Sequence, residues 1–295
     1  LYKAVYKLPN ELKTKVQEIR VRAEKPLALS VGNDTLFVDN KFTLSENYKN
    51  SLVASMEDIV TTFQNICCYS VYSHQNEIKN GFVTMGSGHR VGICGTAVSI
   101  HGEINSVRDI SSLNIRIARE IPNASEELLR RVGKLDGGLL IVGMPCSGKT
   151  TILRDLARRI SLGIDCRIMR TSVVDERSEL SGTYAGISKN DLGLADVLNG
   201  YSKADGIMQA LRTLSPEAII CDEIGASSDM QAIEQGVNAG VSIIATIHAG
   251  NYHELLSRNQ GKALIGTGAF KTIVILDSRE NVGKIKELIR LRGAK

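Results

Sequence analysis

The sequence predicts an α/β protein of two domains, a smaller mixed α/β domain over residues 1–120 and a larger α/β domain over residues 121–295. Its 295 residues are enough for two ordinary domains, since one domain usually takes about 100–200 residues. The first part mixes helical spacing with short alternating segments that glycines interrupt. The second part alternates apolar strands with helices, which is the order that builds a parallel sheet.

The first domain is predicted to begin with a helix over residues 10–20, whose apolar residues recur at helical spacing. Pro26 then forces an extended chain, since the α conformation is disfavoured before a proline. Two alternating segments, residues 27–31 and 35–38, flank a glycine-containing turn at residues 32–34. This pattern predicts a β-hairpin.

A second helix is predicted over residues 55–64, because Ser55 and Asp58 have the spacing of a capping box. From residue 79 onward, glycines interrupt short β segments, which indicates tight turns. Residues 108–119 alternate apolar and polar side chains. They are interpreted as an exposed edge strand that leads into the connection between the domains.

The second domain is expected to hold most of its apolar residues in the strands of one sheet. The predicted strands are residues 138–142, 167–174, 218–221 and 241–247. The predicted helices are residues 149–160, 205–214, 228–239 and 252–257. The tail is predicted to form a strand over 270–276, a turn over 278–281 and a helix or strand over 284–292.

Composition excludes several classes of protein. Hydrophobic residues make up 43% and charged residues 23%, as in an ordinary globular protein rather than a disordered one. No apolar run approaches the roughly 18 residues that can span a bilayer. Residues 1–18 mix charges throughout, so a signal peptide is not expected either.

Charge and cysteine content restrict the partners and the compartment. The net charge of +4, with 4% aromatic residues and no tryptophan, makes a nucleic-acid partner unexpected. The six cysteines form no CxxC pair and have no zinc-ligand spacing with the five histidines. They are interpreted as buried free thiols in a reducing cytoplasm.

The strongest chemical signal is a phosphate-binding loop of the form G-x-x-x-x-G-K-[ST], which follows an apolar strand and precedes an amphipathic helix. Backbone N–H groups of such a loop face the β-phosphate of a nucleotide. Lys149 is expected to reach the β- and γ-phosphates, and Thr150 to take a Mg²⁺ position. The predicted nucleotide-binding residues here are Gly143, Met144, Pro145, Cys146, Ser147, Gly148, Lys149, Thr150 and Thr151.

Acidic residues follow two other predicted strands. Asp222 is expected to bind the nucleotide's Mg²⁺ through a water molecule, and Glu223 to orient or deprotonate the attacking water. Glu176 ends the preceding strand, and it competes for the role of catalytic base because the tips of parallel strands share one edge of a sheet. The alternative for Glu176 is a solvated turn with local ion pairs. The sequence leaves this choice open.

The further candidates are a histidine and several arginines. His248 follows the strand at residues 241–247, where an imidazole can sense a γ-phosphate by donating one hydrogen bond and accepting another. Phosphoryl transfer also needs positive charge beyond the loop lysine, often from an arginine. Arginines of the first domain, taken singly, fit structural roles, but together they suggest action on a neighbouring subunit. The arginine candidates are Arg90, Arg108, Arg116 and Arg119, with Arg212 in the second domain.

Four motifs in order along the chain resemble those of the type II/IV secretion ATPases. They are the loop at 143–150, the acidic strand end at 175–179, Asp222-Glu223-Ile224-Gly225 and Thr246-Ile247-His248, which resemble the Walker A, Asp, Walker B and His boxes. In the first domain, residues 18–22, 81–84, 88–92 and 111–116 are similar to the sporulation stage III AA family of that superfamily. One departure is Asp222-Glu223 where secretion ATPases carry Gly-Glu, which keeps the choice of base open.

This resemblance covers nearly the whole chain and implies more than the residues themselves do. It implies a RecA-like fold for the second domain and ATP hydrolysis that powers the channel between mother cell and forespore. It also implies a homohexameric ring in the mother-cell cytoplasm. The ring would be peripheral to the forespore-facing membrane and docked on membrane-protein partners.

Three rival functions have weaker support. A GTPase is disfavoured because residues 202–205, which mimic a guanine-reading motif, precede the D-x-x-G block instead of following it. A RecA-like DNA motor or helicase shares the ATPase chemistry, but residues 224–245 contain no lysine or arginine to line a DNA pore. An ATP-binding scaffold without hydrolysis is disfavoured by the full set of acidic residues.

Overall fold

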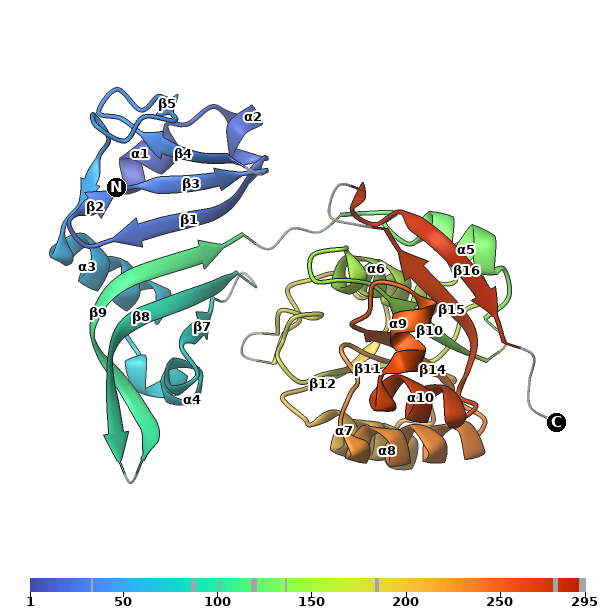
Figure 1. The fold of residues 1–295 in the computed structure, drawn as a ribbon. Helices are drawn as coiled ribbons and strands as arrows, with labels where there is room; N and C mark the ends of the chain where they lie inside the picture. The colour runs from blue at the N-terminus through green and yellow to red at the C-terminus, as the bar shows by residue number, and fades with distance from the viewer. Residues whose placement is uncertain are drawn as a thin grey trace. The chain divides into compact units, whose positions relative to one another are not determined.

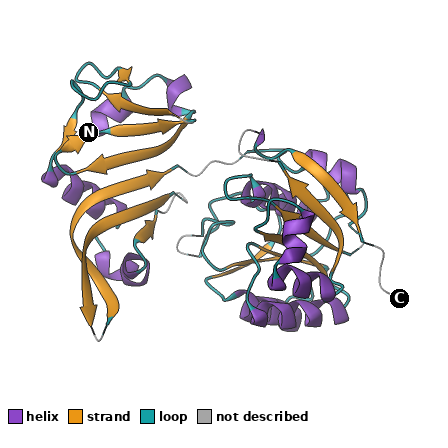
Figure 2. Cartoon of the chain, in the orientation of Figure 1, coloured by secondary structure: helices purple, strands orange, loops and turns teal. Residues whose placement is uncertain are grey.

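The computed structural model forms two compact units, Leu1–Arg119 and Glu120–Lys295, here unit 1 and unit 2. It describes residues 1–32, 34–85, 89–100, 102–117, 121–135, 137–183, 186–277 and 281–291. Both units combine helices and strands (Figures 1 and 2), which confirms the predicted α/β class. Among the described residues, no helix is long and apolar enough to cross a membrane.

Unit 1 is built on an antiparallel sheet whose order, over its described residues, is β5-β4-β3-β1-β9-β8-β7. These strands are β1 (Val16–Arg22), β3 (Ala28–Val31), β4 (Asp34–Val38), β5 (Leu44–Ser45), β7 (Phe82–Thr84), β8 (Arg90–Ile100) and β9 (Glu103–Arg116). The strands β2 (Lys25–Pro26) and β6 (Val53–Ala54) pair separately. The helices are α1 (Tyr2–Tyr6), α2 (Asn10–Lys13), α3 (Met56–Ile66), the 3-10 turn η1 (Val71–His74) and α4 (Gln75–Lys79).

One face of this sheet packs on helices. Ile59 of α3 and Ile78 of α4 are buried in one cluster with Val91 of β8 and Leu113 of β9. Because side chains alternate across a strand, the polar residues between these apolar positions lie on the opposite face.

Two predictions for unit 1 are wrong, and both fail for a tertiary reason. Of the helix predicted over residues 10–20, only α2 (Asn10–Lys13) is helical, and residues 16–20 belong to the strand β1 because Ile19 pairs with Leu29 of β3 and with Ile115 of β9. The expected edge strand, β9, lies in the interior of the sheet between β1 and β8. Sheet pairing thus overrides local spacing, which is a weak guide to strands.

Two other predictions for unit 1 are confirmed. Strands β3 and β4 pair as the predicted hairpin, although Asn33 at its turn lies outside the described residues. The helix α3 begins at the predicted capping box: Ser55 Oγ accepts a hydrogen bond from Asp58 N at 3.1 Å, and the Asp58 carboxylate accepts one from Ser55 N at 2.9 Å.

Unit 2 is built on a sheet whose order, over its described residues, is β12-β11-β13-β14-β10-β15-β16, parallel except for β16. These strands are β10 (Gly138–Val142), β11 (Thr171–Asp175), β12 (Asp196–Asn199), β13 (Ala218–Cys221), β14 (Ser242–Ile247), β15 (Phe270–Leu276) and β16 (Ile285–Arg290). The helices are α5 (Glu126–Val132), α6 (Lys149–Leu162), α7 (Lys203–Thr213), α8 (Ser227–Asn238), α9 (Tyr252–Ser257) and α10 (Asn259–Gly266).

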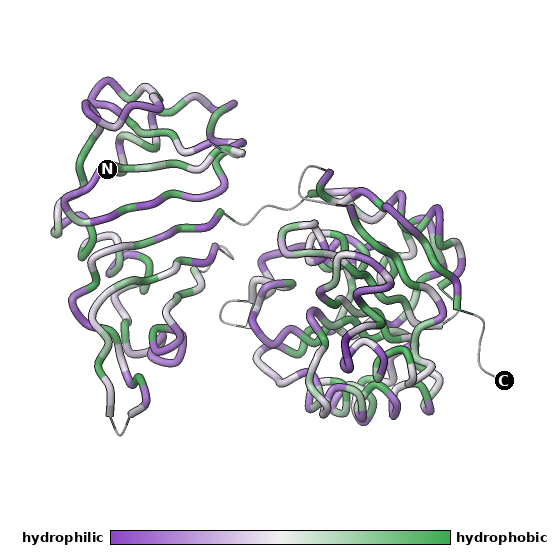
Figure 3. The backbone as a smooth tube through the Cα atoms, viewed as in Figure 1, coloured by the Kyte–Doolittle hydropathy of each residue, from purple (hydrophilic) through white to green (hydrophobic). Residues whose placement is uncertain are grey.

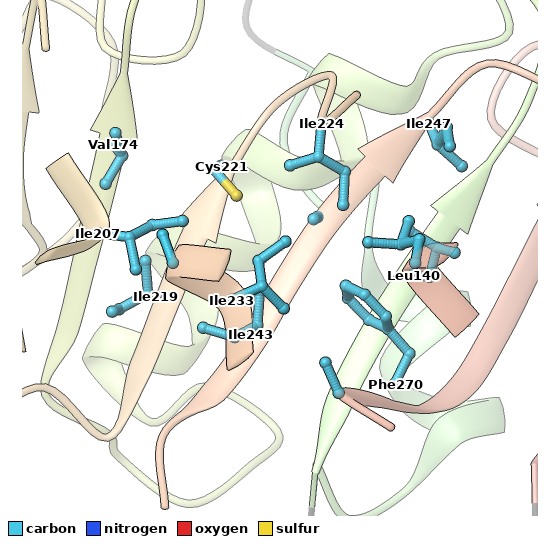
Figure 4. Close-up of a cluster of buried hydrophobic side chains, with 14 of the residues drawn as sticks. Leu140, Val174, Ile207, Ile219, Cys221, Ile224, Ile233, Ile243, Ile247 and Phe270 are labelled. Atoms are coloured by element: carbon cyan, nitrogen blue, oxygen red, sulfur yellow. The ribbon is translucent and has the colours of Figure 1, made fainter. Parts of the chain in front are cut away.

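Helices cover both faces of this sheet, which explains why its central strands β10, β13 and β14 are almost entirely apolar (Figure 3). Along β10, Leu140 packs on the side of α7, α8, α9 and α10 (Figure 4). Its neighbour Ile141 packs on the side of α5 and α6. The polar residues that follow the strands therefore gather at the carboxyl edge of the sheet.

The predicted strands and helices of unit 2 are confirmed with shifted bounds, except that β11 begins only at Thr171. The sequence did not predict α5, β12 and α10, which lack a strong periodic pattern. Residues 285–290 form the strand β16, which decides the choice left open for the tail. The predicted turn at 278–281 falls mostly on residues 278–280, outside the described part of the chain.

The cysteines are free, as predicted, but most are not buried. Only Cys67 and Cys221 of the six are buried, whereas Cys68, Cys94 and Cys146 are exposed and Cys166 is half-buried. Burial was predicted wrongly for Cys94 because a strand exposes every second side chain on an open face, and for Cys68, Cys146 and Cys166 because they lie in connecting segments outside the strands and helices.

Candidate active site

The phosphate loop wraps between β10 and α6. Gly148 caps α6 in the left-handed conformation with φ of 94°, which favours glycine, and Cys146 also has a positive φ of 66°. Gly143 must lack a side chain, since a Cβ would stand 2.4 Å from Ser147 Oγ. The first N–H groups of α6 have no partner within the helix and, with its dipole, favour an anion.

Lys149 is buried at 5% exposure, and its ammonium has a complete set of partners. It donates to Gly143 O at 3.0 Å and Met144 O at 3.1 Å, and it contacts His248 Nδ1 at 3.0 Å. Burial lowers the pKa of Lys149, and the carboxylates of Asp222 and Glu223 oppose that shift. The Lys149 ammonium therefore donates to three acceptors, which hold it against the phosphate loop.

His248 connects this lysine to Glu223. An ammonium has no acceptor, so His248 Nδ1 must accept from Lys149 and Nε2 must carry the proton. His248 Nε2 lies 2.7 Å from Glu223 Oε1 and therefore donates to it. Arg258 donates to His248 O at 2.8 Å and also pairs with the Glu254 carboxylate, which fixes the segment after β14.

Asp222 accepts hydrogen bonds from both neighbouring motifs. Thr150 Oγ1 donates to Asp222 Oδ2 at 2.7 Å, and Thr246 Oγ1 donates to Asp222 Oδ1. Glu223 N lies 3.0 Å from Asp222 Oδ1 and 2.8 Å from Thr246 Oγ1, and Glu223 has a positive φ of 48°. A non-glycine residue in that conformation is strained, and the surrounding hydrogen bonds hold it.

Glu176 lies in a different setting from Glu223. The strands β13 and β14 separate β11 from β10, so Glu176 does not lie beside the phosphate loop, contrary to the expectation from the sequence. It forms an ion pair with Lys203 of α7. Asp175 is buried and accepts N–H groups of residues 179–181, which fixes the turn. Glu176 nevertheless lines a small pocket that it shares with Asp222 and Glu223.

The residues around Thr150 fit a Mg²⁺ ion. A threonine hydroxyl and an aspartate carboxylate are hard oxygen ligands, and here they are already within hydrogen-bonding distance of each other. Within the described ranges, no group of three His, Cys, Asp or Glu residues is arranged to hold a metal. In nucleotide sites, Mg²⁺ usually takes one or two protein ligands and completes its shell with phosphate oxygens and water.

The phosphate loop also carries an orphaned polar group. Ser147 Oγ is buried and, over the described part of the chain, has no hydrogen-bond partner. A buried hydroxyl without a partner costs free energy, and such groups occur where a ligand or water completes the structure. This observation fits a loop that binds an anion.

The arginine candidates fall in three places. Arg90 of β8 and Arg116 of β9 are paired across the strands, and Glu18 of β1 is paired with Arg116 on its other side. Arg116 is exposed, 3.6 Å from Glu18, whereas Arg90 stacks on the Phe82 ring at 4.0 Å.

The other arginine candidates lie away from this pair. Arg108 is eight residues from Arg116 along β9 and contacts Asp109. Arg212 is in the last turn of α7, before β13 begins, and so lies at the opposite edge of the sheet from the phosphate loop. Arg119 lies outside the described residues.

Three residues shape this site although no role was predicted for them from the sequence: Thr246, which was named only as part of the Thr246-Ile247-His248 motif, Lys203 and Arg258. Thr246 is fully buried and bridges Asp222 to the Glu223 backbone, and its signal was a lone hydroxyl in an otherwise apolar strand. Lys203 and Arg258 pair with acids or carbonyls of the site. Their roles depend on chain distant in sequence, and no local pattern marks them.

The comparisons with known proteins identify the family. The family model for sporulation stage III, protein AA, matches residues 4–295. Stage III sporulation protein AA of Bacillus subtilis (strain 168) is 34% identical over 288 residues, which is 97% of this chain and 90% of that protein. The chain therefore belongs to the sporulation stage III AA family, as the sequence motifs indicated.

Solved structures of secretion ATPases share the fold. The pilus retraction motor PilT with bound ADP has a TM-score of 0.60 at 16% identity, covering 90% of this chain and 75% of that chain. The ATPase DotB of Yersinia pseudotuberculosis has a TM-score of 0.58 at 17% identity, covering 90% and 72%. The predicted RecA-like fold is confirmed, and at this identity the likeness concerns the fold alone.

Proposed function

We propose that this member of the sporulation stage III AA family hydrolyses ATP, with Mg²⁺ as cofactor, at the carboxyl edge of the unit 2 sheet. The observation that carries the proposal is the continuous chain of contacts from Lys149 through His248 to Glu223. It links a phosphate-binding lysine to a carboxylate that can accept a proton from water.

Triphosphate binding supplies a reason for this chain of contacts. Lys149 has three donors, all of them used, so a phosphate oxygen can bind it only by displacing a present acceptor. The neutral His248 is the displaceable acceptor, because the two carbonyls belong to the loop itself. Displaced from Lys149, His248 loses the hydrogen bond at Nδ1, and because its Nε2 contacts Glu223 the change reaches that carboxylate, which supports the role of sensor.

The Mg²⁺ ion would be held by Thr150 directly and by Asp222 through water, with Thr246 orienting the carboxylate. Bound there, the ion neutralises developing charge on the β- and γ-phosphates. Of the two competing acids, Glu223 is the better base, because it is attached to the Lys149–His248 pair whereas Glu176 is neutralised by Lys203.

The remaining positive charge is proposed to come from a neighbouring subunit of a homo-oligomeric, hexameric ring. Arg90 and Arg116 stand together on the polar face of the unit 1 sheet, and Arg116 is exposed. Arg108 has no such companion and is not assigned this role. We further propose that the ring powers the mother-cell-to-forespore channel, on the mother-cell side of the membrane, through membrane-protein partners of the sporulation complex.

The test is the ATPase rate per subunit as a function of protein concentration, with light scattering on the same samples. We expect the rate to rise as the hexamer forms, because the arginines then reach a neighbouring site. Lys149→Ala is the control: it should abolish turnover at every concentration while the circular-dichroism spectrum stays unchanged. A flat rate from a monomer would contradict the proposed ring, and turnover by Lys149→Ala would contradict the site.

A further inference from the structure

A second pocket adjoins the phosphate loop on the side away from the acidic residues. It is lined by Gly148, Thr151 and Ile152 of the loop and α6 and by residues 282–284 before β16. Its other lining residues precede or belong to α5: Ile121, Asn123, Ala124, Glu126, Glu127 and Arg130. In the sheet order, Asp222 and Glu223 follow β13, on the β14 side of β10, whereas residues 282–284 follow β15 on its other side. The two pockets therefore lie on opposite sides of the loop.

This placement matches the extended shape of a nucleotide. If the γ-phosphate points toward Glu223, the ribose and base must leave the loop on the opposite side. Ile121 and Val282 line the pocket there, with more than half of each apolar side chain exposed. A planar aromatic base would cover this apolar surface. Gly283 N donates to Ser147 O at 2.9 Å, which attaches that side of the pocket to the loop.

The wall formed by residues 121–124 is held in place from beneath. Asp155 of α6 accepts hydrogen bonds from Asn123 N at 3.2 Å, Ser125 N at 2.8 Å and Ser125 Oγ at 2.7 Å. Arg159 donates to Asp155 at 3.1 Å and to Asn123 Oδ1 at 2.7 Å. Asn123 has a positive φ of 65°, a conformation that the network holds.

Asp155 and Arg159 are 5% and 3% exposed, so both charges are almost fully removed from water. A buried ion pair is often no more stable than apolar residues of the same size, so the role of this pair follows from the groups that it holds in Asn123 and Ser125. The pair lies on the helix that begins with Lys149, and it fixes the wall of a pocket at that helix's first turn.

We propose that the Asp155–Arg159 pair positions residues 121–124 as one wall of a base-binding pocket, so that this network sets the affinity for the base of the nucleotide. The inference rests on the proposed function only in taking an adenine nucleotide as the ligand. Asp155, Arg159 and Ser125 are positioning residues, since each acts through the backbone of the wall.

The test compares the binding of ADP with that of inorganic pyrophosphate, both with Mg²⁺, by isothermal titration calorimetry on the full chain. Neither ligand carries a γ-phosphate, so hydrolysis plays no part. Ser125→Ala removes one hydrogen bond to Asp155, and we expect it to weaken ADP binding about 2- to 10-fold while pyrophosphate binding stays unchanged. Ala124→Trp, which fills the pocket, should weaken ADP binding more and again spare pyrophosphate.

The matched control is Ser161→Ala. Ser161 is also a buried serine, and it bonds Leu192 O and Leu194 N at the far end of α6 instead of the wall. We expect its affinity for both ligands to match that of the unmodified chain.

Several outcomes would overturn the proposal. Equal losses for ADP and pyrophosphate in Ser125→Ala would indicate a distorted phosphate loop. Unchanged ADP binding in both Ser125→Ala and Ala124→Trp would contradict the base-binding role of the pocket. The same conclusion would follow if the unmodified chain bound ADP no tighter than pyrophosphate. An unmodified chain that shows the expected pattern but fails to hydrolyse ATP would support the pocket and contradict the proposed function alone.

Discussion

Both units combine a β-sheet with helices, but they place their charged side chains differently. In unit 2, helices cover both faces of the sheet, and the charged groups at its carboxyl edge are paired with one another. In unit 1, helices cover one face, and the other presents polar residues such as Arg116, which is exposed. At the carboxyl edge of unit 2 the charged groups contact one another, whereas Arg116 of unit 1 stays exposed although it lies 3.6 Å from Glu18.

This contrast has a physical origin in strand direction. Parallel strands need crossover helices, which bury both faces and bring every polar strand end to one edge. Antiparallel strands joined by short turns leave a face open, and residues paired across strands form rows on it. A catalytic set that needs both a preorganised pocket and an added charge can thus be divided between the two kinds of sheet.

The largest effect is expected from removing the exposed charge of Arg116 in unit 1. We expect Arg116→Ala to lower kcat of the oligomer by about 10³-fold, since an arginine finger contributes on this order or more. The control is Arg108→Ala, on the same strand but away from Arg90, which should leave kcat nearly unchanged. Mixing Arg116→Ala with Lys149→Ala subunits should restore part of the activity, because each supplies what the other lacks. Activity that mixing fails to restore would contradict action between subunits.

A second substitution pair tests the paired charges of unit 2. Glu223→Gln keeps the side-chain shape but cannot accept a proton, so kcat should fall about 10²- to 10⁴-fold. Glu176→Gln removes the contact with Lys203 but leaves Glu223 as the base, so kcat should fall less than about 5-fold. Steady-state kinetics with saturating Mg²⁺ and ATP gives both values. The reverse ranking would assign the base to Glu176.

The smallest expected effect concerns the cores. Burial raises the pKa of the Cys67 thiol in unit 1 to about 11 and that of Cys221 in unit 2 to about 12. Unfolded thiols ionise near the usual 9.0 while the buried ones keep their protons, so the free energy of unfolding should fall as the pH rises from 9 toward 11.

Urea denaturation between pH 8 and pH 10.5 measures this effect. The decrease in stability should be smaller for Cys67→Ala or Cys221→Ala than for the unmodified chain or for Cys94→Ala, whose thiol is exposed. If the units unfold in separate transitions, each buried-cysteine variant should change only its own. Equal slopes for all variants would mean that these thiols do not control the alkaline loss of stability.

Local chemistry explains which predictions succeeded. The phosphate loop needs glycines at fixed positions, the capping box needs a hydroxyl and a carboxylate three residues apart, and buried parallel strands need continuous apolar runs. Each of these requirements is met within a few consecutive residues. The helix prediction failed at residues 16–20, because their apolar spacing suits a helix and only pairing with β3 and β9 makes them part of a strand.

Local patterns were enough to identify the α/β class, the phosphate loop, and the acids and histidine that follow the strands, since a few adjacent residues encode each of them. The RecA-like fold was implied by the family resemblance, and the solved structures confirm it. Only the tertiary structure decided which of these groups meet. It joined Lys149 to His248 and Glu223, and it paired Glu176 with Lys203. It also brought residues 121–125 onto α6 through Asp155. These contacts depend on the order of strands in the sheet, which follows from the packing of the whole chain and from no local pattern.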